Sequence, residues 1–345
     1  MIRSPKILVI GKTRSIVYWV ESTVTAFHES GCTVKHFSLN GDSVWQSLRY
    51  KWSKRWRGDA TDSICTDLEQ MLHHFQPDII LFVAIAALYM PENLFTLCRS
   101  ECPRARLAVW IGDRLNQKEA AFSHHVDHVF VTDTGFMADL RQQGYTVPVS
   151  YLPLAVDTNF FRPQAVSRSN KIVFVANRSP GRGDILEQIQ HPVSLYGKGW
   201  SALKNPVHDV HASRLPRRQL PFVYAGARAV LNIHQDKNVI HGLNQRSFEP
   251  CACKIPVLHD DMLDLPRCFE PEKEVLVYRS LEELHYWCER SKNSHQRWRG
   301  RMATGSGRAY LASAWAKHLA HIRMIYVNNL SNFVSSLCEF SKYPR

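Results

Sequence analysis

Long apolar runs are absent from this sequence of 345 residues. The longest run, residues 79–90, has 12 residues and ends at Pro91, whereas a membrane-spanning helix needs about 20. The N-terminal segment carries charge and a short apolar run, but Gly11 and Lys12 follow too soon for a signal peptide. These two absences predict a cytoplasmic protein.

Cysteine pairs of the zinc-binding type are absent as well. The nine cysteines are scattered, and the close pairs Cys98/Cys102 and Cys251/Cys253 have neither C-x-x-C spacing nor a matching second half. An odd number of cysteines in a chain without a secretion signal favours reduced thiols. We expect no structural metal.

Acidic residues are in deficit, because 31 Asp and Glu stand against 43 Lys and Arg and leave a formal charge of +12. Such a charge predicts an acidic partner: nucleic acid, an anionic membrane face or a phosphorylated substrate. Charge alone does not choose among them. The composition, 45% hydrophobic and 21% charged, is that of a globular protein, and the length suits about two domains.

What is present is an alternation of apolar strands and helical segments. Strands are predicted at 6–11, 33–39, 79–84, 106–112 and 128–133. Strands that are apolar on both faces and alternate with helices indicate a parallel sheet covered on both sides. A second α/β series starts at 171, after a linker at 149–170. We predict an α/β protein of two Rossmann-like domains, with the carboxyl ends of both sheets facing a central cleft.

The stretch FVANRSPGRGD, residues 174–184, reads as a strand that runs into a glycine-rich loop. Gly181 and Gly183 let backbone amides approach an anion, and Arg178 and Arg182 supply positive charge. The stretch contains neither G-x-G-x-x-G nor the GK[ST] of a P-loop. An exposed basic turn is the alternative interpretation.

The stretch NQRSFEPCACKIPVLHDD, residues 244–261, is the second candidate. A helix beginning near Arg246 would offer its positive dipole end to a diphosphate, and Arg246 would reinforce the contact. Glu249, about one turn in, can accept both hydroxyls of a ribose. A carboxylate that merely improves the helix N-terminus, for about 0.3–1 kcal/mol, is the alternative, but its core-like neighbours favour a function. We interpret residues 259–261 as the rim of a loop.

A family resemblance appears in these residues. HGLNQRSFEPCACKIPVLHDDMLDLPRCFEPEKEVLVYRSLEEL resembles the signature of the CgeB-like glycosyltransferases, relatives of the retaining group-1 transferases: N-x-R-x-F-E-x-x-A-C-G before a strand and an acidic loop, then GKE…YRS…EL. Corresponding stretches occur in the same order: WIGDR, HVFVTDTGFMADLRQQG, YLPLAVDTNFFRP, IVFVANRSPGRGDIL and LYGKGW. The resemblance covers about Leu107 to Leu284.

The resemblance implies a GT-B fold, with a nucleotide-sugar donor on the second domain and the acceptor mainly on the first. The implied domains are 1–155 for the acceptor, 156–310 for the donor, and 311–345 as C-terminal helices that pack back toward the N-terminal domain. By this comparison Glu249 holds the donor ribose. The remaining donor-site candidates are Arg178, Arg182, Asn244 and Arg246 for the diphosphate, and His234 and His241 for the sugar.

The sequence departs from the family at two positions. The wider group has a Glu eight residues before Glu249, where this chain has His241. Lys254 stands where the family usually has Gly. Sugar identity and donor orientation are therefore left open.

The expected chemistry needs no metal, because Arg residues and a helix N-terminus can stabilise the departing diphosphate. No D-x-D motif with suitable surroundings is present. If the reaction inverts, a general base must come from the first domain, and Asp113 after the strand of WIGDR is the candidate; the alternative is an Asp that caps a turn. His234 is the second catalytic candidate.

The segment WQSLRYKWSKRWRG, Trp45 to Gly58, has five basic residues, no acids and four interleaved aromatics. Aromatics among cations suit stacking on nucleic acid bases, and equally an interfacial loop that lies on anionic lipid. We favour an anionic membrane surface or an acidic glycan acceptor. A solvated segment whose tryptophans pack on the domain is the second interpretation, and nucleic acid the third.

These observations favour a metal-independent, retaining glycosyltransferase without a cofactor. Its expected partners are a nucleotide-diphosphate-sugar donor and a cell-surface glycan, lipid-linked or protein acceptor. We expect it in the cytoplasm, peripheral at the inner face of the membrane. Two alternatives stay open: an epimerase or hydrolase of sugar nucleotides with the same fold, and a non-enzymatic protein that binds nucleic acid or an anionic surface.

Overall fold

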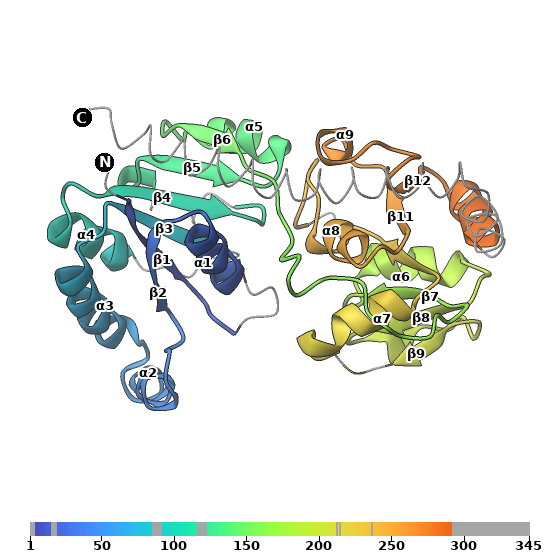
Figure 1. The fold of residues 1–345 in the computed structure, drawn as a ribbon, viewed down its shortest axis with the longest axis horizontal. Helices are drawn as coiled ribbons and strands as arrows, with labels where there is room; N and C mark the ends of the chain where they lie inside the picture. The colour runs from blue at the N-terminus through green and yellow to red at the C-terminus, as the bar shows by residue number, and fades with distance from the viewer. Residues whose placement is uncertain are drawn as a thin grey trace. The chain divides into compact units, whose positions relative to one another are not determined.

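A computed structural model describes residues 4–14, 19–84, 92–115, 123–211, 213, 215–235 and 237–291. The chain forms two compact units, of which the first runs to Pro153 and the second begins at Leu154 (Figure 1). The segment 311–345, expected to form C-terminal helices, lies outside the described residues. No helix in the described part is both long enough and apolar enough to cross a membrane.

The first unit is built on a six-stranded parallel sheet in the order β2-β1-β3-β4-β5-β6. Its strands are β1 Lys6–Gly11, β2 Thr33–Ser38, β3 Ile79–Ala84, β4 Arg106–Ile111, β5 His128–Val131 and β6 Val149–Tyr151. Its helices are α1 Trp19–Glu29, α2 Val44–Arg57, α3 Thr61–Phe75, α4 Glu92–Glu101 and α5 Thr134–Gln142. The apolar runs predicted as strands form them because residues such as those of β1 are buried on both faces of the sheet.

The second unit has a parallel sheet of its own, in the order β12-β11-β10-β7-β8-β9. Its strands are β7 Ile172–Val175, β8 Val193–Tyr196, β9 Asp209–His211, β10 Ala229–Asn232, β11 Val257–Asp260 and β12 Leu276–Tyr278. Its helices are α6 Pro180–Gln188, α7 Leu220–Gly226, α8 Gln245–Ala252 and α9 Leu265–Cys268, with 3₁₀ turns at Trp200–Ala202 and Arg217–Gln219; residues 281–291 are also helical.

The strand order of the second sheet places the ligand site. Counted from β7, the order is 3-2-1-4-5-6 read from the β9 edge, which is the doubly wound Rossmann order. The order reverses between β7 and β10, neighbours in the sheet although more than 50 residues apart in the chain. Loops that leave two such strands part to opposite faces and form a crevice at their carboxyl ends. Residues just after β7 and β10 therefore lie at the expected binding edge.

The structure corrects three local details expected from the sequence. Gly181, Arg182 and Gly183 do not form a loop but the first turn of α6, where the Gly183 amide donates to the Ser179 carbonyl at 2.8 Å. The linker predicted at 149–170 does contain the boundary between the two units, at Pro153 and Leu154, but it begins with the edge strand β6 and buries Leu154.

The basic-aromatic segment is the third. Residues of Trp45 to Gly58 form the regular helix α2, with Ser43 as the N-cap and Gly58, at φ 77°, as the left-handed C-cap. Trp45, Trp52 and Trp56 are exposed. The interpretation in which these tryptophans pack on the domain is therefore contradicted.

The cysteines of the described segments are free thiols, eight in number. Lys254, the departure from the family glycine, lies just after α8 with φ +60°. A left-handed residue after a helix favours Gly, since a Cβ there clashes with the backbone. The family glycine thus fits the left-handed backbone conformation at this position, which Lys254 adopts here at a cost in strain.

Replacing Lys254 by Gly should raise the free energy of unfolding by about 1 kcal/mol, because the left-handed conformation no longer carries a Cβ. Urea denaturation of the full chain measures the change. Lys254→Ala is the matched control, since it removes the long side chain but keeps the Cβ, and it should bring no gain. Equal stability of the two variants would contradict the backbone explanation.

Candidate functional site

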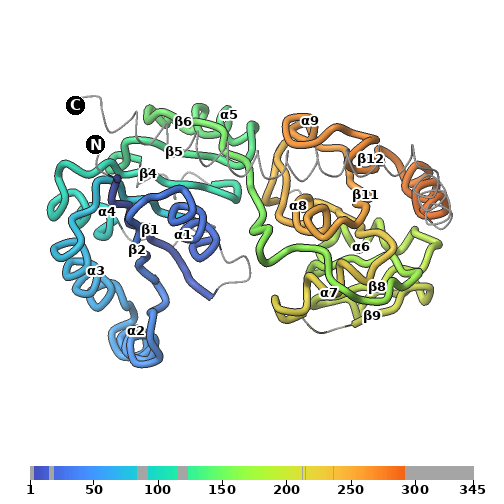
Figure 2. Tube along the Cα trace, in the orientation of Figure 1, coloured from blue at the N-terminus to red at the C-terminus, as the bar shows by residue number. Residues whose placement is uncertain are grey.

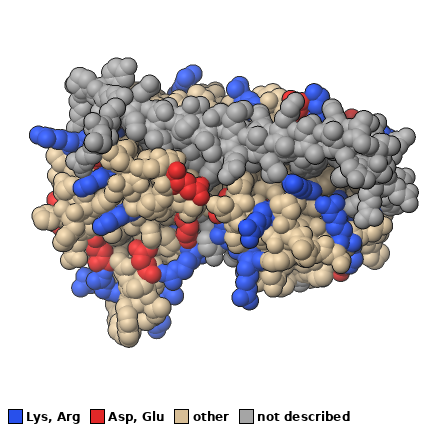
Figure 3. Space-filling view, viewed as in Figure 1, with Lys and Arg blue, Asp and Glu red and all other residues tan. Residues whose placement is uncertain are grey.

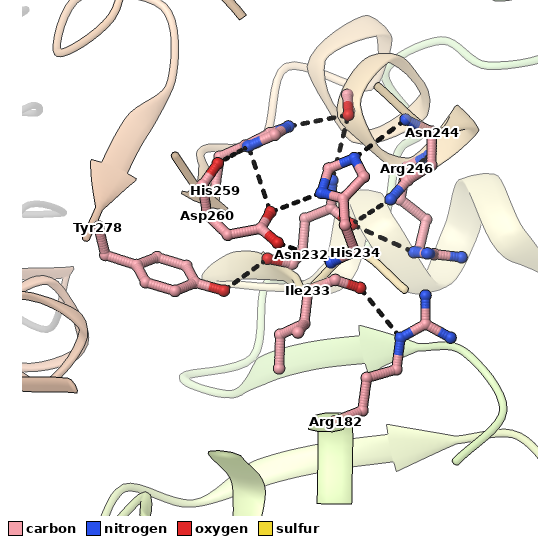
Figure 4. A network of polar contacts seen from close by, with 10 residues as sticks. Arg182, Asn232, Ile233, His234, Asn244, Arg246, His259, Asp260 and Tyr278 are labelled. Carbon is pink, nitrogen blue, oxygen red and sulfur yellow. Dashed lines mark hydrogen bonds and ion pairs between the residues drawn. The ribbon is translucent and has the colours of Figure 1, made fainter. Parts of the chain in front are cut away.

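The carboxyl ends of β10, β11 and β12 meet in a network of buried polar side chains with the N-terminus of α8 (Figure 4). Asp260, the last residue of β11, accepts two hydrogen bonds from His234, which follows β10. The His234 backbone amide donates to Oδ2 at 2.7 Å and Nδ1 donates to Oδ1 at 2.6 Å. Burial raises the pKa of Asp260, but the contacts with His234 and His259 outweigh it and lower the pKa to about 2. Asp260 is therefore an anion.

The ring of His234 is held on both sides. Its Nε2 accepts the backbone amide of Asn244 at 3.1 Å, so the ring proton lies on Nδ1, where it meets Asp260. His234 is 6% exposed. The candidate sugar-binding and catalytic histidine thus links two strand ends to the start of α8.

Asn244 begins α8 as its N-cap. Its Oδ1 accepts the Arg246 amide at 2.9 Å and its Nδ2 donates to Asn232 Oδ1 at 3.0 Å. Asn232 also accepts Arg246 Nε at 3.3 Å and donates to Ser247 Oγ at 3.1 Å. The expected helix near Arg246 is therefore present, and its first turn is tied to the end of β10.

His259 completes the network below α8. Its Nδ1 donates to its neighbour's carbonyl, Asp260 O, at 2.6 Å, and its Nε2 accepts Ser247 Oγ at 2.8 Å. Burial lowers the pKa of His259 to about 4, so the ring is neutral. The interpretation of residues 259–261 as a loop rim is wrong for the first two, which end β11 inside the network; Asp261 alone is exposed, and it pairs with Arg279 at 3.1 Å.

A metal ion has one candidate group in the described segments. His234, His259 and Asp260 offer three ligand atoms within 4.8 Å of one another. All four ring nitrogens already have hydrogen-bond partners, and Asp260 is balanced by its donors. This donor set is satisfied as a hydrogen-bonded network, so a metal would have to displace protons from both rings. The expectation of no metal stays a prediction.

Glu249 lies one turn into α8, as expected, and is buried at 9% exposure. Its Oε2 accepts the hydroxyl of Tyr224, on α7, at 3.1 Å. Burial raises the pKa of Glu249 to about 7, against the lowering effect of Tyr224, Arg246 and Arg217. Among the described residues no donor reaches its other oxygen, Oε1, which is the atom left for a ligand hydroxyl.

The three arginine candidates differ in what they contact. Arg182 is 6% exposed, and its guanidinium donates to the carbonyls of Ile233 and Asn177 and to Gln235. It thereby holds α6 to the segment after β10. Arg246 is half-buried; burial lowers its pKa, and Nε is the only nitrogen of its guanidinium in a hydrogen bond with the described residues.

Arg178 lies three residues after the end of β7 and is exposed. Its guanidinium lies over Gly183, where an added Cβ would come within 2.9 Å of it. An added Cβ at Gly183 would meet only the movable end of this exposed side chain, so the glycine allows the close approach of Arg178 to the start of α6 without being required for it. That helix begins at Pro180, which has no N–H to donate, and Ser179 gives no side-chain cap, so the N-terminus is left uncapped toward an anion.

The two remaining candidates take other positions. His241 is half-buried before α8, and its carbonyl accepts the Asp264 amide at 3.0 Å. Asp113 belongs to the first unit, at the carboxyl end of β4. The structure thus joins His234, Asn244 and Arg246 by hydrogen bonds, and a catalytic role for Asp113 stays a prediction.

A cavity of about 550 Å³ opens beside the network, lined by Ile185, Gln188, Asp260, Asp261, Tyr278, Arg279, Ser280, Leu281 and Leu284. Two of its lining residues, Asp260 and Tyr278, belong to the network. The Tyr278 hydroxyl donates to the Asn232 carbonyl at 2.8 Å. The donor-site candidates do not line it. The cavity and the donor-site candidates are therefore separate features of the second unit.

Sequence reasoning missed Asn232, Ser247, Tyr224 and the buried role of Asp260. One signal could have found part of the network. VLNIH and VLHD are apolar strands that end in polar residues, and parallel strands place their carboxyl ends at one edge of a sheet. Tyr224 has no such signal, because α7 reaches α8 only in the folded chain.

Comparison with known proteins agrees with this architecture. HepE of Anabaena, whose crystal structure is a complex with UDP and glucose, superposes with a TM-score of 0.61 over 96% of this chain and 100% of its own, at 12% identity. This chain has a GT-B fold. Residues 178–327 match the glycosyl transferase-like family, and the fold class expected from the sequence is confirmed.

The sequence resemblance is confirmed too. The spore protein CgeB of Bacillus subtilis (strain 168) is 24% identical over 157 residues, which are 39% of this chain and 48% of CgeB. The chain thus spans about half the length of the curated relative that it matches. The glycosyl transferase-like family match and this relative each cover less than half of the chain, and both agree with the resemblance found in the sequence.

Replacing Glu249 by Gln should stabilise the protein at high pH. The unfolded carboxyl loses its proton near its ordinary pKa of 4.5, but the folded one keeps it up to about 7. Wild-type stability from this group is present below 4.5 and is lost as the pH rises through 7. The Gln variant, which loses nothing, should therefore match wild type at pH 4 and exceed it at pH 8 by up to about 3 kcal/mol.

Urea denaturation across this pH range measures the difference. Tyr224→Phe is the second arm: it removes the donor that lowers the Glu249 pKa, so its stability should go on falling above pH 7. A Gln variant whose advantage does not grow with pH would contradict the buried, proton-binding carboxyl.

Proposed function

We propose that this protein is a glycosyltransferase that moves a sugar from a nucleotide-diphosphate donor to a cell-surface glycan, lipid-linked or protein acceptor. The observation that carries the proposal is the convergence at the β7/β10 switch point. The open N-terminus of α6, the N-terminus of α8, Arg178, Arg246 and the buried Glu249 all belong to this edge of one sheet.

Each group has a role in donor binding. The helix N-termini and the two arginines would hold the diphosphate and stabilise it as it departs, which is the main requirement of the transfer. Glu249 Oε1 would accept the ribose hydroxyls, with Tyr224 fixing the carboxylate. Arg182 and Asn244 would position these groups, given their contacts with Ile233, Asn232 and the Arg246 amide.

His234 would contribute by orientation. Its ring is clamped between Asp260 and the Asn244 amide, so it presents a carbon edge and a rigid backbone to the sugar rather than a free nitrogen. His241, at the place of the family's first Glu, would lie beside the sugar. We keep retention of the anomeric configuration and metal independence as parts of the proposal, and Asp113 as the base if the reaction inverts.

UDP is the first donor nucleotide to try, because HepE, which shares the fold, is a complex with UDP and glucose. The proposed location is cytoplasmic, peripheral at the inner face of a membrane, where a lipid-linked acceptor would be found. The alternatives of an epimerase or hydrolase keep the same donor site and differ only in the fate of the sugar.

Nucleotide binding should raise the melting temperature. In a thermal-shift panel of UDP, GDP, dTDP, ADP and CMP, one nucleotide at about 100 times its Kd should add about 2.7 kcal/mol of stability. Glu249→Ala should weaken both this nucleotide and its nucleoside, since both carry the ribose. Arg178→Ala should weaken the diphosphate alone.

Arg168→Ala, an exposed arginine outside the site, is the control and should bind as wild type does. A panel without any response, or a Glu249→Ala variant that binds like wild type, would overturn the donor-site assignment.

Turnover should require an acceptor and no divalent cation. With the matching nucleotide sugar and membrane-derived glycolipid, the rate of nucleotide release should be unchanged within about twofold by EDTA, because the arginines and helix N-termini carry the leaving-group charge. NMR of the product gives the anomeric configuration. Rapid hydrolysis or epimerisation of the donor without acceptor would favour the alternative enzymes instead.

A further inference from the structure

Helix α2 turns its polar side inward and its large apolar side chains outward. The only residue of the helix that is fully buried is Tyr50. Trp45, Trp52 and Trp56 are 82%, 67% and 80% exposed, and Leu48 is exposed beside them. These four residues, which we call the tryptophan stripe, are spaced three, four and four apart, so they lie on one face of the helix.

The orientation of this face is fixed by hydrogen bonds to α3. Asp67 of α3 accepts Tyr50 OH at 2.6 Å and Gln46 Nε2 at 2.7 Å, and Arg49 pairs with the same carboxylate. Burial and the Asp67 hydrogen bond raise the pKa of Tyr50, so its hydroxyl stays protonated as the donor. The helix cannot roll to bury the stripe without breaking these bonds.

Positive charge lies around the helix outside the stripe: Arg55 and Lys51 are beside it, whereas Lys54 and Arg57 lie toward the opposite side. The helix has no acidic residue, and four cations besides Arg49 are exposed on it: Lys51, Lys54, Arg55 and Arg57. Figure 3 shows blue side chains on either side of a tan tip where Figures 1 and 2 place α2, while red side chains lie above it. The helix therefore presents a convex apolar ridge bordered by cations.

We propose that α2 binds the surface of an anionic lipid membrane, with the tryptophan stripe at the level of the headgroups. A helix with an apolar face of tryptophan and leucine and a cationic remainder suits insertion in the interface. The exposed cations meet the negative surface potential. A nucleic acid strand would instead need a groove that tracks its backbone between stacking platforms, whereas α2 is a ridge.

The binding does not depend on the proposed donor chemistry, which lies in the second unit. It goes beyond that chemistry by giving the enzyme a surface on which a lipid-linked or membrane-bound acceptor is concentrated. Loss of membrane binding and loss of nucleotide binding are therefore separable.

The test uses the full chain and sedimentation with vesicles of phosphatidylcholine, with or without phosphatidylglycerol. We expect binding to the anionic vesicles, weakened at least tenfold in 0.5 M salt. The triple variant Trp45→Ser/Trp52→Ser/Trp56→Ser should bind at least tenfold more weakly at low salt. Its side chains are exposed, so its melting temperature and nucleotide response should stay those of wild type.

The matched control is Leu263→Ser/Tyr286→Ser, which removes exposed large side chains of the second unit and should bind vesicles like wild type. Equal binding of the triple variant and wild type would overturn the proposal, as would equal binding to neutral and anionic vesicles. Tryptophan-dependent binding to a single-stranded oligonucleotide, or tryptophan-dependent dimerisation in sedimentation velocity, without vesicle binding would assign the stripe to that other partner instead.

Discussion

The second unit depends on one constraint: an anionic carboxylate that is half-buried at the end of a strand must be paired with donors. Asp260 meets it by accepting the amide and the ring of His234. With its proton held on Nδ1, His234 has only Nε2 to offer, and that atom accepts the amide of Asn244. Asn244 in turn starts α8. The place of Glu249, five residues later, thus follows from a chain of hydrogen bonds that begins at Asp260.

This chain also explains which groups stay open for a ligand. The polar side-chain atoms of Asn232, Ser247 and His259 are engaged in hydrogen bonds within the network. The open atoms lie around it: the first amides of α6, the outer nitrogens of Arg246, the guanidinium of Arg178 and Oε1 of Glu249. The internal pairing is rigid, and the open set has the chemistry of a diphosphate and ribose site.

The same pairing rule produces the opposite surface at α2. There the polar side chains of Gln46, Arg49 and Tyr50 converge on Asp67, and their hydrogen bonds hold the inner face. The tryptophans face outward because the face toward α3 is already occupied by the polar side chains that bind Asp67. A helix that exposes its largest apolar residues to solvent has a surface suited to contact with a partner.

Much of the architecture was predictable from the sequence, because apolar strands that alternate with helices specify a parallel α/β sheet locally, and residues 244–249 specify a helix start by their N-cap and spacing. The glycine position held by Lys254 is likewise local, since it follows from the backbone at the end of α8.

What the sequence could not decide were the long-range pairs: Asp260 with His234, Glu249 with Tyr224, and Asp67 with Tyr50. Their partners lie 17 to 26 positions apart. Local pattern determines which segments become helices and strands. Which polar groups pair with each other, and which are left for a ligand or a membrane, is decided only when the elements pack and exclude water between them.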